Sequence, residues 1–432
     1  MQLVSTSMDD SAGMSSDVER STRLNSTLGT LHNLKANISP NFAVLKRGSC
    51  LSSNAKMLGR NIFRSTSNVG SETLRRGSRS ISSKKGAIDV HTHMYLPSYM
   101  NVLRKRTEIP RVINVQGQDR LVILPGEDKD ITTATGRPIG REYWDIKAKI
   151  QYMDKHNIQK SIISLANPWL DFLTGDAAAS VAQELNDELQ GICEKSKGRI
   201  FGMATLPVRN PAAAVKEVQR LKSLSAIKGV ILGTPGAGSG LDHANCRDML
   251  LAIEASGLPI FLHPHYGVGV EHFTDSGHAL FLALGFPMET TICVSRMITS
   301  GALDKMPELK ILVAHAGAAL PSLIGRLDSC VAHDIHIANR LQHAPTDYLK
   351  RMYFDAISYS TPAMEHLIKI VGDDRIMFGT DNPFFPPVGV SADKVCEHEW
   401  PSTTKVWNTL GDLNKKTQKK IVRDNAIRIF GL

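Results

Sequence analysis

The 432-residue sequence predicts an α/β protein, a (β/α)8 TIM barrel with a lid insertion after the first strand and a disordered N-terminal tail. From Ala87 onward, short apolar runs alternate with amphipathic segments, which is typical of parallel βα units rather than of hairpins. The alternation repeats eight times, and eight parallel strands close a barrel. We therefore expect one barrel domain over residues 86–432 and a separate tail over residues 1–85.

Eight apolar segments are the predicted strands. They are Ala87–His91, Ser161–Leu165, Ile200–Leu206, Gly229–Gly233, Pro259–His263, Ile311–His315, Tyr353–Ile357 and Arg375–Gly379. Helices are predicted between them, and one begins at Asn210-Pro211, which combines a capping side chain with a first-turn proline. The stretch between the first strand and about Tyr143 is too long for an ordinary βα loop, so we expect it to form a lid over the site.

The first 85 residues differ from the rest in charge and composition. They hold 13 of the 51 Lys and Arg and 5 of the 42 Asp and Glu, a net charge of +8, which leaves 38 against 37, or +1, for the remainder. This segment is rich in Ser, Asn, Gly and Arg and poor in aromatic residues, which predicts disorder. A barrel without a basic stripe gives no reason to expect a nucleic-acid partner.

The compartment is predicted from the cysteines and the tail. Six scattered cysteines without a CxxC pair disfavour a disulfide framework and indicate a reducing, cytoplasmic location. Residues 57–85 are Arg-rich and Ser-rich with a single acid, Glu72, which is the composition of a mitochondrial transit peptide, although a basic linker is the plain alternative. The sequence has no run of about 18 apolar residues, so we expect no membrane span.

The first predicted strand ends in the motif Asp89-Val90-His91-Thr92-His93. In an extended chain, residues i and i+2 project to the same face, so His91 and His93 are expected to point together into the mouth of the barrel. Two imidazoles at a strand end suit a divalent metal ion. The HxH spacing alone is weak, because a chance pair of histidines on a strand is common.

Three further strand ends carry residues that bind metals or transfer protons. The fifth strand ends in His263 followed by His265, the sixth ends in His315, and Asp381 lies just past the eighth. Active sites of such barrels are assembled from the C-terminal ends of several strands, so this recurrence predicts a metal site rather than scattered core histidines. Nitrogen and carboxylate ligands without thiolate favour Zn²⁺, with Mn²⁺ and Fe²⁺ as alternatives.

Strands that end in HxH, His, His and Asp, in that order, resemble the amidohydrolase superfamily. Three segments narrow the resemblance to its aminocarboxymuconate-semialdehyde decarboxylase branch, whose members use no organic cofactor: Gly285–Thr291, Ile311–Asp328 and Phe378–Pro387. Three others resemble the fungal uracil-5-carboxylate (isoorotate) decarboxylases: Asp89–Met100, Ile163–Leu173 and Phe261–Gly267. The resemblance covers about residues 87–432 and leaves the tail unexplained.

The resemblance implies a ligand set of His91, His93, His263 and Asp381, with His315 beside the metal-bound water or substrate. Asp381 would also be the proton donor, directly or through that water, and His315 would orient the reacting group. The alternative for Asp381 is a helix cap, and His265 is expected outside the ligand set. The branch often forms homodimers. Asn382 stands where the isoorotate enzymes carry His, which puts the substrate in doubt.

Four residues are candidates for binding the acid. Arg296 offers a guanidinium for bidentate binding of a carboxylate, with a salt bridge between barrel elements as the alternative. Asn167 would bind a ring carbonyl or amide, unless it only forms the turn before Pro168. Arg106 on the lid and Phe384 as an apolar wall are lesser candidates.

The function predicted from these residues is metal-dependent, non-oxidative decarboxylation of a small unsaturated carboxylic acid that resembles 5-carboxyuracil. Decarboxylation of 2-amino-3-carboxymuconate-6-semialdehyde is one alternative. Another is hydrolysis of a substrate such as a lactone, because the same ligands serve a metal-bound water as nucleophile and the fold does not separate the two.

Overall fold

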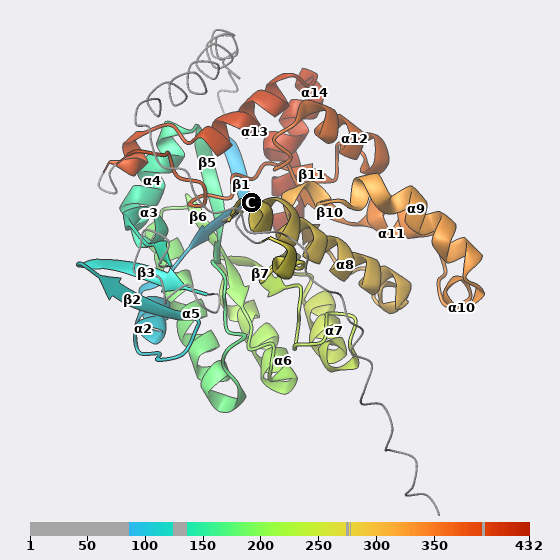
Figure 1. Ribbon diagram of the computed structural model, residues 1–432, viewed down its shortest axis with the longest axis horizontal. Helices are drawn as coiled ribbons and strands as arrows, with labels where there is room; N and C mark the ends of the chain where they lie inside the picture. The colour runs from blue at the N-terminus through green and yellow to red at the C-terminus, as the bar shows by residue number, and fades with distance from the viewer. Residues whose placement is uncertain (1–85, 124–135, 274–275, 277, 391–393) are drawn as a thin grey trace, which may run out of the picture. The chain divides into compact units, whose positions relative to one another are not determined.

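The computed structural model describes residues 86–123, 136–273, 276, 278–390 and 394–432. Its centre is an eight-stranded parallel sheet in the order β1-β5-β6-β7-β8-β9-β10-β11 (Figure 1). The strands are β1 (Ala87–Met94), β5 (Ile158–Leu165), β6 (Ile200–Thr205), β7 (Ile227–Gly233), β8 (Ile260–His263), β9 (Ile311–Val313), β10 (Tyr353–Asp355) and β11 (Ile376–Met377). The predicted barrel is confirmed, and each predicted strand overlaps an observed one.

The barrel closes between its first and last strands. Val90 N donates to Phe378 O at 3.0 Å, and Thr92 and Asn382 form an isolated parallel bridge. The strand β11 is only two residues long, shorter than predicted, although the chain after Met377 continues beside β1, as the hydrogen bonds from Thr380 N and Asp381 N to His91 O show. This seam lies beside the HxH motif.

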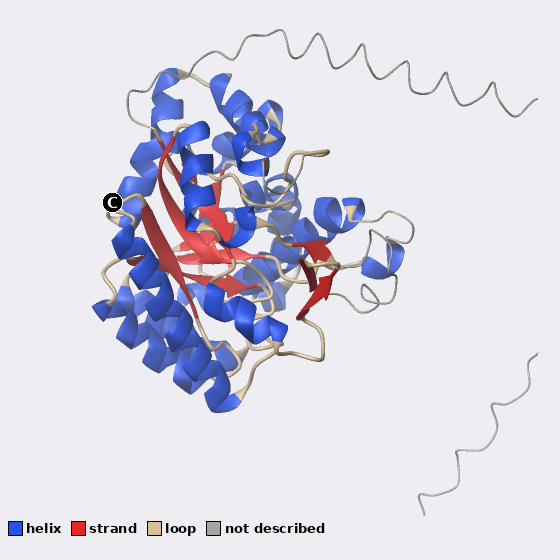
Figure 2. Ribbon diagram, turned by 90° about the vertical axis from the view of Figure 1, so that its left-hand side faces the viewer, coloured by secondary structure: helices blue, strands red, loops and turns tan. Residues whose placement is uncertain are grey.

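Helices surround the barrel, as Figures 1 and 2 show. They are α2 (Pro97–Arg104), α3 (Arg141–Trp144), α4 (Ile146–Lys155), α5 (Gly175–Lys195), α6 (Pro211–Arg220), α7 (Arg247–Ser256), α8 (Phe286–Thr299), α9 (Leu320–His333), α10 (Ile335–Ala338), α11 (Pro345–Arg351), α12 (Thr361–Val371), α13 (Pro401–Gly411), α14 (Lys415–Lys419) and α15 (Asn425–Phe430). The Asn210 side chain caps α6 as predicted, because it accepts a hydrogen bond from Ala213 N at 3.2 Å.

The insertion after the first strand contains a small antiparallel sheet that sequence reasoning did not predict. It consists of β2 (Arg111–Val115), β3 (Gln118–Val122) and β4 (Arg137–Pro138), in the order β2-β3-β4. The strands β2 and β3 form a hairpin through Gln116 and Gly117, both with positive φ. Residues 124–135, which are part of the predicted lid, lie outside the described residues, as does the predicted tail.

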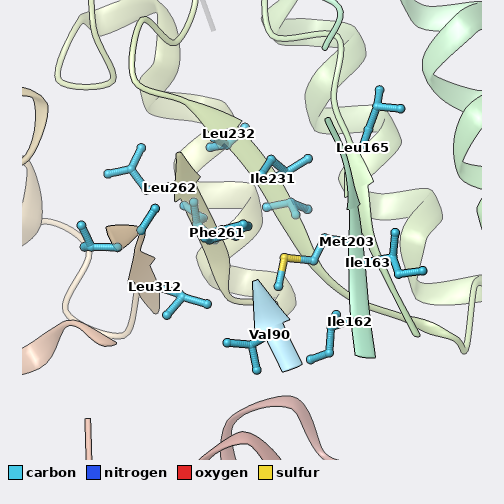
Figure 3. Close-up of a cluster of buried hydrophobic side chains, with 14 of the residues drawn as sticks. Val90, Ile162, Ile163, Leu165, Met203, Ile231, Leu232, Phe261, Leu262 and Leu312 are labelled. Atoms are coloured by element: carbon cyan, nitrogen blue, oxygen red, sulfur yellow. The ribbon is translucent and has the colours of Figure 1, made fainter. Parts of the chain in front are cut away.

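The barrel interior is a packed apolar core beneath the polar strand ends. Val90, Ile162, Met203, Ile231 and Phe261 come from five different strands, and all are buried (Figure 3). Bulky side chains from many strands fill a barrel of this size, so the strands are held rigidly where their C-terminal ends carry functional groups. The core therefore fixes the positions of the site residues.

One helical stretch in the described part of the chain, Phe281–Thr299, is long and apolar enough that length and composition alone would allow it to cross a membrane. Its mean hydropathy is 1.2, and 39% of it is buried. Val294, Met297 and Ile298 on this stretch are buried against the protein, which is also the pattern of a core helix. The length and composition of this stretch are therefore weak evidence for a membrane span.

Candidate active site

The structure brings the four predicted metal ligands together at the C-terminal end of the barrel. His91 and His93 lie on β1, His263 ends β8, and Asp381 follows β11. Each residue offers one ligand atom, and these atoms lie within 4.8 Å of one another. All four residues are buried, so the cluster belongs to the interior of the site rather than to its rim.

Each ligand histidine is oriented by a neighbour that contacts its Nδ1 atom. These contacts are Asp355 Oδ2 at 2.6 Å for His91, Ser164 Oγ at 2.8 Å for His93, and Pro264 O at 2.7 Å for His263. Groups of this kind fix the ring orientation of metal-binding histidines. All three rings therefore present Nε2 as the free nitrogen.

The atoms that face the centre fit a divalent metal ion. The Nε2 atoms of His91, His93 and His263 and the Oδ1 atom of Asp381 are buried, and none has a hydrogen-bond partner in the described part of the chain. Leaving one such atom unsatisfied costs about 1–3 kcal/mol, so four in one place need an explanation. Three imidazole nitrogens and one carboxylate oxygen form a donor set that suits Zn²⁺ or Mn²⁺.

The electrostatics of the metal-free cluster point the same way. Burial opposes a charge on His91, but the carboxylates of Asp381 and Asp355 outweigh it and raise the pKa of His91 to about 10. Burial lowers the pKa of His93 to about 4 and that of His263 well below its usual value. The pKa of Asp381 is well below its usual value because the nearby histidines outweigh its burial. In the metal-free protein, His91 thus carries the positive charge beside the two carboxylates, and binding of a metal ion would displace the proton from its Nε2 atom.

His315 lies beside the cluster, as predicted, but just past strand β9. It begins a short 3-10 turn, His315–Gly317, and its φ of 57° is in the left-handed region, which costs energy for a residue with a side chain. Its Nε2 is 3.7 Å from Asp381 Oδ2, and its backbone N–H donates to Asp355 Oδ2 at 2.7 Å. The turn thus aims the imidazole at the second oxygen of Asp381.

Asp355, at the end of β10, is a site residue that sequence reasoning missed. Besides contacting His91, its carboxylate accepts hydrogen bonds from the backbone N–H groups of His315, Ala316 and Ile357. It therefore joins a ligand histidine to the turn that carries His315. The rule of polar residues at strand ends did not single it out, because the seventh predicted strand was drawn to Ile357, whereas the observed strand β10 ends at Asp355.

One predicted substrate residue, Phe384, contacts a ligand, since its ring is 5.4 Å from the ring of His93. Asn167 is buried, and its side-chain amide donates to His265 O at 3.3 Å. The Nε2 atom of His265 is 2.8 Å from Asp171 Oδ2, and His265 is outside the group of four residues that could hold a metal ion. Asn167 is thus joined to the segment that follows the ligand His263.

The two predicted arginines have protein partners in the structure, and Arg296 forms the salt bridge that was the alternative to binding the acid. Its guanidinium pairs with Asp242 Oδ1 at 3.0 Å, and its side chain is 49% exposed. The helix α8 begins at Phe286 near His263, and ten residues at about 1.5 Å each carry Arg296 away from that end. Arg106 is at the rim, where it donates to Pro110 O at 2.6 Å and covers the Phe172 ring at 4.2 Å.

Arg137 on β4 is a cation that lies against Phe384, near the ligand cluster. Its Cζ atom lies 4.8 Å from the centroid of the Phe384 ring, which in turn contacts His93. Burial raises the pKa of Tyr95, and the nearby positive charge of Arg137 works against that shift. No sequence motif marked Arg137, because its place depends on how the inserted sheet packs on the barrel.

Comparisons with known proteins agree with this geometry. The sequence model described as amidohydrolase matches residues 88–432. The apo crystal structure of Metarhizium anisopliae IDCase, an isoorotate decarboxylase, is 38% identical with a TM-score of 0.76, covering 80% of this chain and 97% of that one. A 2-amino-3-carboxymuconate-6-semialdehyde decarboxylase of Dictyostelium discoideum is 23% identical over 305 residues, 68% of this chain and 79% of that protein.

A third similar protein has a metal in its structure. A 5-carboxyvanillate decarboxylase of Novosphingobium aromaticivorans, solved with bound manganese, is 23% identical with a TM-score of 0.66, covering 81% of this chain and 97% of that one. At this identity the likeness shows the fold alone. Together with the buried ligand cluster and the family match, these comparisons show that the chain belongs to the amidohydrolase family and is a metal-dependent carboxy-lyase.

Proposed function

We propose that this protein decarboxylates a small, flat, unsaturated acid that resembles 5-carboxyuracil, without oxidation. The observation that carries the proposal is the set of four convergent ligand atoms with an aromatic side chain, Phe384, against His93 and a guanidinium, Arg137, over the Phe384 ring. The aromatic side chain of Phe384 can cover a planar ring, and the guanidinium of Arg137 can pair with its single carboxylate. The relationship to the Metarhizium isoorotate decarboxylase supports the same class of substrate.

The reaction breaks the bond between a vinylic carbon and its carboxylate, releases CO₂, and leaves an electron pair on the carbon, which then takes a proton. A bound divalent ion would supply Lewis-acid stabilisation and a template for the carboxylate and a neighbouring carbonyl oxygen. Phe384 would cover the ring, and Arg137 would hold the negative charge of the acid until the bond breaks. Asn167 would hydrogen-bond the ring edge.

The proton is proposed to reach the carbon through Asp381 and His315. Asp381 Oδ2 lies 3.7 Å from His315 Nε2, on the opposite side of the carboxylate from the oxygen that faces the ligand cluster. One carboxylate would thus serve both the metal and the proton transfer. Asp355 positions His315 for this role by holding its backbone N–H.

The ring acid is favoured over the open-chain alternative by the count of cations. Aminocarboxymuconate semialdehyde has two carboxylates, so a pocket that binds it is expected to provide two cationic side chains. Arg106 donates to the carbonyls of Ile109 and Pro110 and stacks on Phe172 at the rim, and Arg296 is bound to Asp242. Arg137 lies over Phe384, and we propose that it serves the single carboxylate of the ring acid.

The test is a comparison of kcat/KM for CO₂ release from 5-carboxyuracil and from aminocarboxymuconate semialdehyde on one metal-loaded preparation. We expect the ring acid to be preferred, and Asn167→Ala to cost roughly 1–3 kcal/mol of transition-state stabilisation because a buried ring group loses its partner. Preference for the open-chain acid, with Asn167→Ala harmless, would overturn the substrate while leaving the decarboxylase class intact. Lactone hydrolysis without CO₂ release would favour the hydrolase alternative.

We also propose the identity of the metal, the oligomeric state and the compartment. Zn²⁺ remains the first proposal, and Mn²⁺ is supported by the manganese bound in the Novosphingobium enzyme.

The exposed apolar side chains of Leu284, Met288 and Ile292 are four residues apart along one helical stretch. This apolar stripe supports a homodimer, which analytical ultracentrifugation would test. A cytoplasmic location is proposed, with the mitochondrion as alternative if residues 57–85, outside the described part, act as a transit peptide.

A further inference from the structure

A buried lysine lies directly behind the ligand cluster, and the mechanism above gives it no role. Lys149 is on the inward face of α4 with Tyr152 and Met153, and it is only 1% exposed. An ammonium group in the interior is costly unless all of its N–H donors have acceptors and a negative charge is near. The groups that surround Lys149 must therefore compensate for its burial, and they indicate its role.

The ammonium group of Lys149 has three donors, and three acceptors surround it. It donates to Thr92 Oγ1 at 2.7 Å, to Asn382 Oδ1 through a short hydrogen bond, and to Asn382 O at 3.4 Å. Thr92 Oγ1 donates in turn to Asn382 O at 2.9 Å. Asp89, fully buried, interacts electrostatically with the lysine and supplies a negative charge.

These acceptors lie between or next to metal ligands. Thr92 stands between His91 and His93, and Asn382 follows Asp381. The two segments form the closing seam of the barrel, where β1 meets the chain that follows β11. The backbone hydrogen bonds at the level of the ligands are His93 N to Asn382 O at 2.8 Å, Asp381 N to His91 O at 2.8 Å and Thr380 N to His91 O at 3.2 Å. Lys149 joins the two sides of this seam.

We infer that Lys149 is a positioning residue that holds the two sides of the seam together and thereby sets the spacing of three of the four metal ligands. Without its ammonium group, Thr92 Oγ1 and Asn382 Oδ1 lose their donor, and the side-chain contacts left across the seam include Thr92 Oγ1 with Asn382 O and Thr380 Oγ1 with Asp89 Oδ2 at 2.6 Å. The ligands His91, His93 and Asp381 would then shift relative to one another. The inference rests on the metal cluster and not on the proposed substrate.

The test is the metal affinity of Lys149→Met, which keeps the length of the side chain and removes its charge and donors. We expect the dissociation constant for Zn²⁺ or Mn²⁺, measured by competition with a chromophoric chelator, to rise about 10- to 100-fold, as for other residues that support metal ligands. Lys149→Arg keeps charge and donors and should recover much of the affinity. Lys160→Met is the matched control, because Lys160 contacts Phe201 on a barrel strand away from the seam, and we expect it to leave metal affinity unchanged.

A structural role alone would lower the free energy of unfolding without changing metal affinity in the folded protein. Lys149→Met with wild-type metal affinity would therefore overturn the inference. If Lys149→Met does not fold, Thr92→Val tests the same contact more mildly, since it removes one acceptor of the ammonium group while keeping the shape. It should weaken metal binding by several-fold, and an unchanged dissociation constant would overturn the inference equally. Failure of the proposed function would show differently, as no CO₂ release from 5-carboxyuracil by the natural chain, whose metal affinity is measured separately.

Discussion

Each ligand histidine uses one ring nitrogen for a protein neighbour and has the other available for the metal. For His91 the neighbour is Asp355, for His93 it is Ser164, and the neighbour of His263 is the carbonyl of Pro264. Because the Nδ1 atoms are engaged, the tautomer and the direction of each ring are set before any metal binds. These contacts therefore hold the three imidazole rings in the orientation that metal binding requires.

At the scale of single residues, we expect different effects on kcat/KM from substituting Arg137 and from substituting Arg296. Arg137→Met should lower kcat/KM for the acid roughly 10- to 100-fold, because a charge-assisted contact to a carboxylate is worth about 1.5–3 kcal/mol. Arg296→Met removes a half-exposed ion pair with Asp242 and should change kcat/KM less than about threefold. Steady-state kinetics of the two variants side by side would decide. Equal losses would return Arg296 to the site.

The residues that could be predicted from sequence are those placed by a strand. His91 and His93 follow from i, i+2 alternation, and His263 and Asp381 from their position at strand ends. Arg296 could not be placed, because its distance from the site depends on the direction of the helix after Phe286. Arg137 could not be found, because its contact with Phe384 depends on the packing of an insertion.

At the scale of elements, α4 is fastened to the C-terminal region through its cap. His156 follows α4, its Nε2 accepts from Trp400 N at 3.4 Å, and its backbone carbonyl accepts from Trp407 Nε1 at 3.1 Å. Burial lowers the pKa of His156 to about 4. The ring is thus neutral at physiological pH and acts as an acceptor.

This cap predicts a loss of stability in mild acid. Between pH 6.5 and 4 the unfolded chain protonates His156 while the folded chain does not, so stability falls as pH falls, by on the order of 3 kcal/mol over the window. His156→Gln keeps an acceptor without titrating there, and should flatten the pH dependence relative to the natural chain. Urea midpoints of the metal-free proteins at pH 7.5 and pH 4.5 measure it. Parallel profiles would show that His156 does not contribute.

The strands of the barrel were predictable because each is a continuous apolar run with a polar end. The inserted sheet was missed, although its sequence contains a signal: Gln116 and Gly117 connect β2 to β3 with φ values of 52° and 84°, the geometry of a two-residue hairpin. The strand β4 could not be predicted, because two residues are too few for any periodicity. It is this strand that carries Arg137.

For the whole molecule, the barrel is expected to be independent of the tail. Deleting residues 1–85 should leave the free energy of unfolding and kcat/KM unchanged, because the first strand begins at Ala87 and the core consists of residues after it. Urea denaturation and steady-state kinetics of the truncated protein measure this. An insoluble or inactive truncation would place part of the fold within those residues and move the domain boundary.

The central claim, that the four-ligand cluster binds a metal on which decarboxylation depends, is tested most directly by titrating chelator-treated protein with Zn²⁺ or Mn²⁺ while CO₂ release from 5-carboxyuracil is followed. We predict that activity is lost with the metal and returns in proportion to it up to about one ion per chain, and that His263→Ala neither retains the ion nor recovers activity, since too few ligands remain. Full CO₂ release from protein shown by elemental analysis to be metal-free would contradict the account.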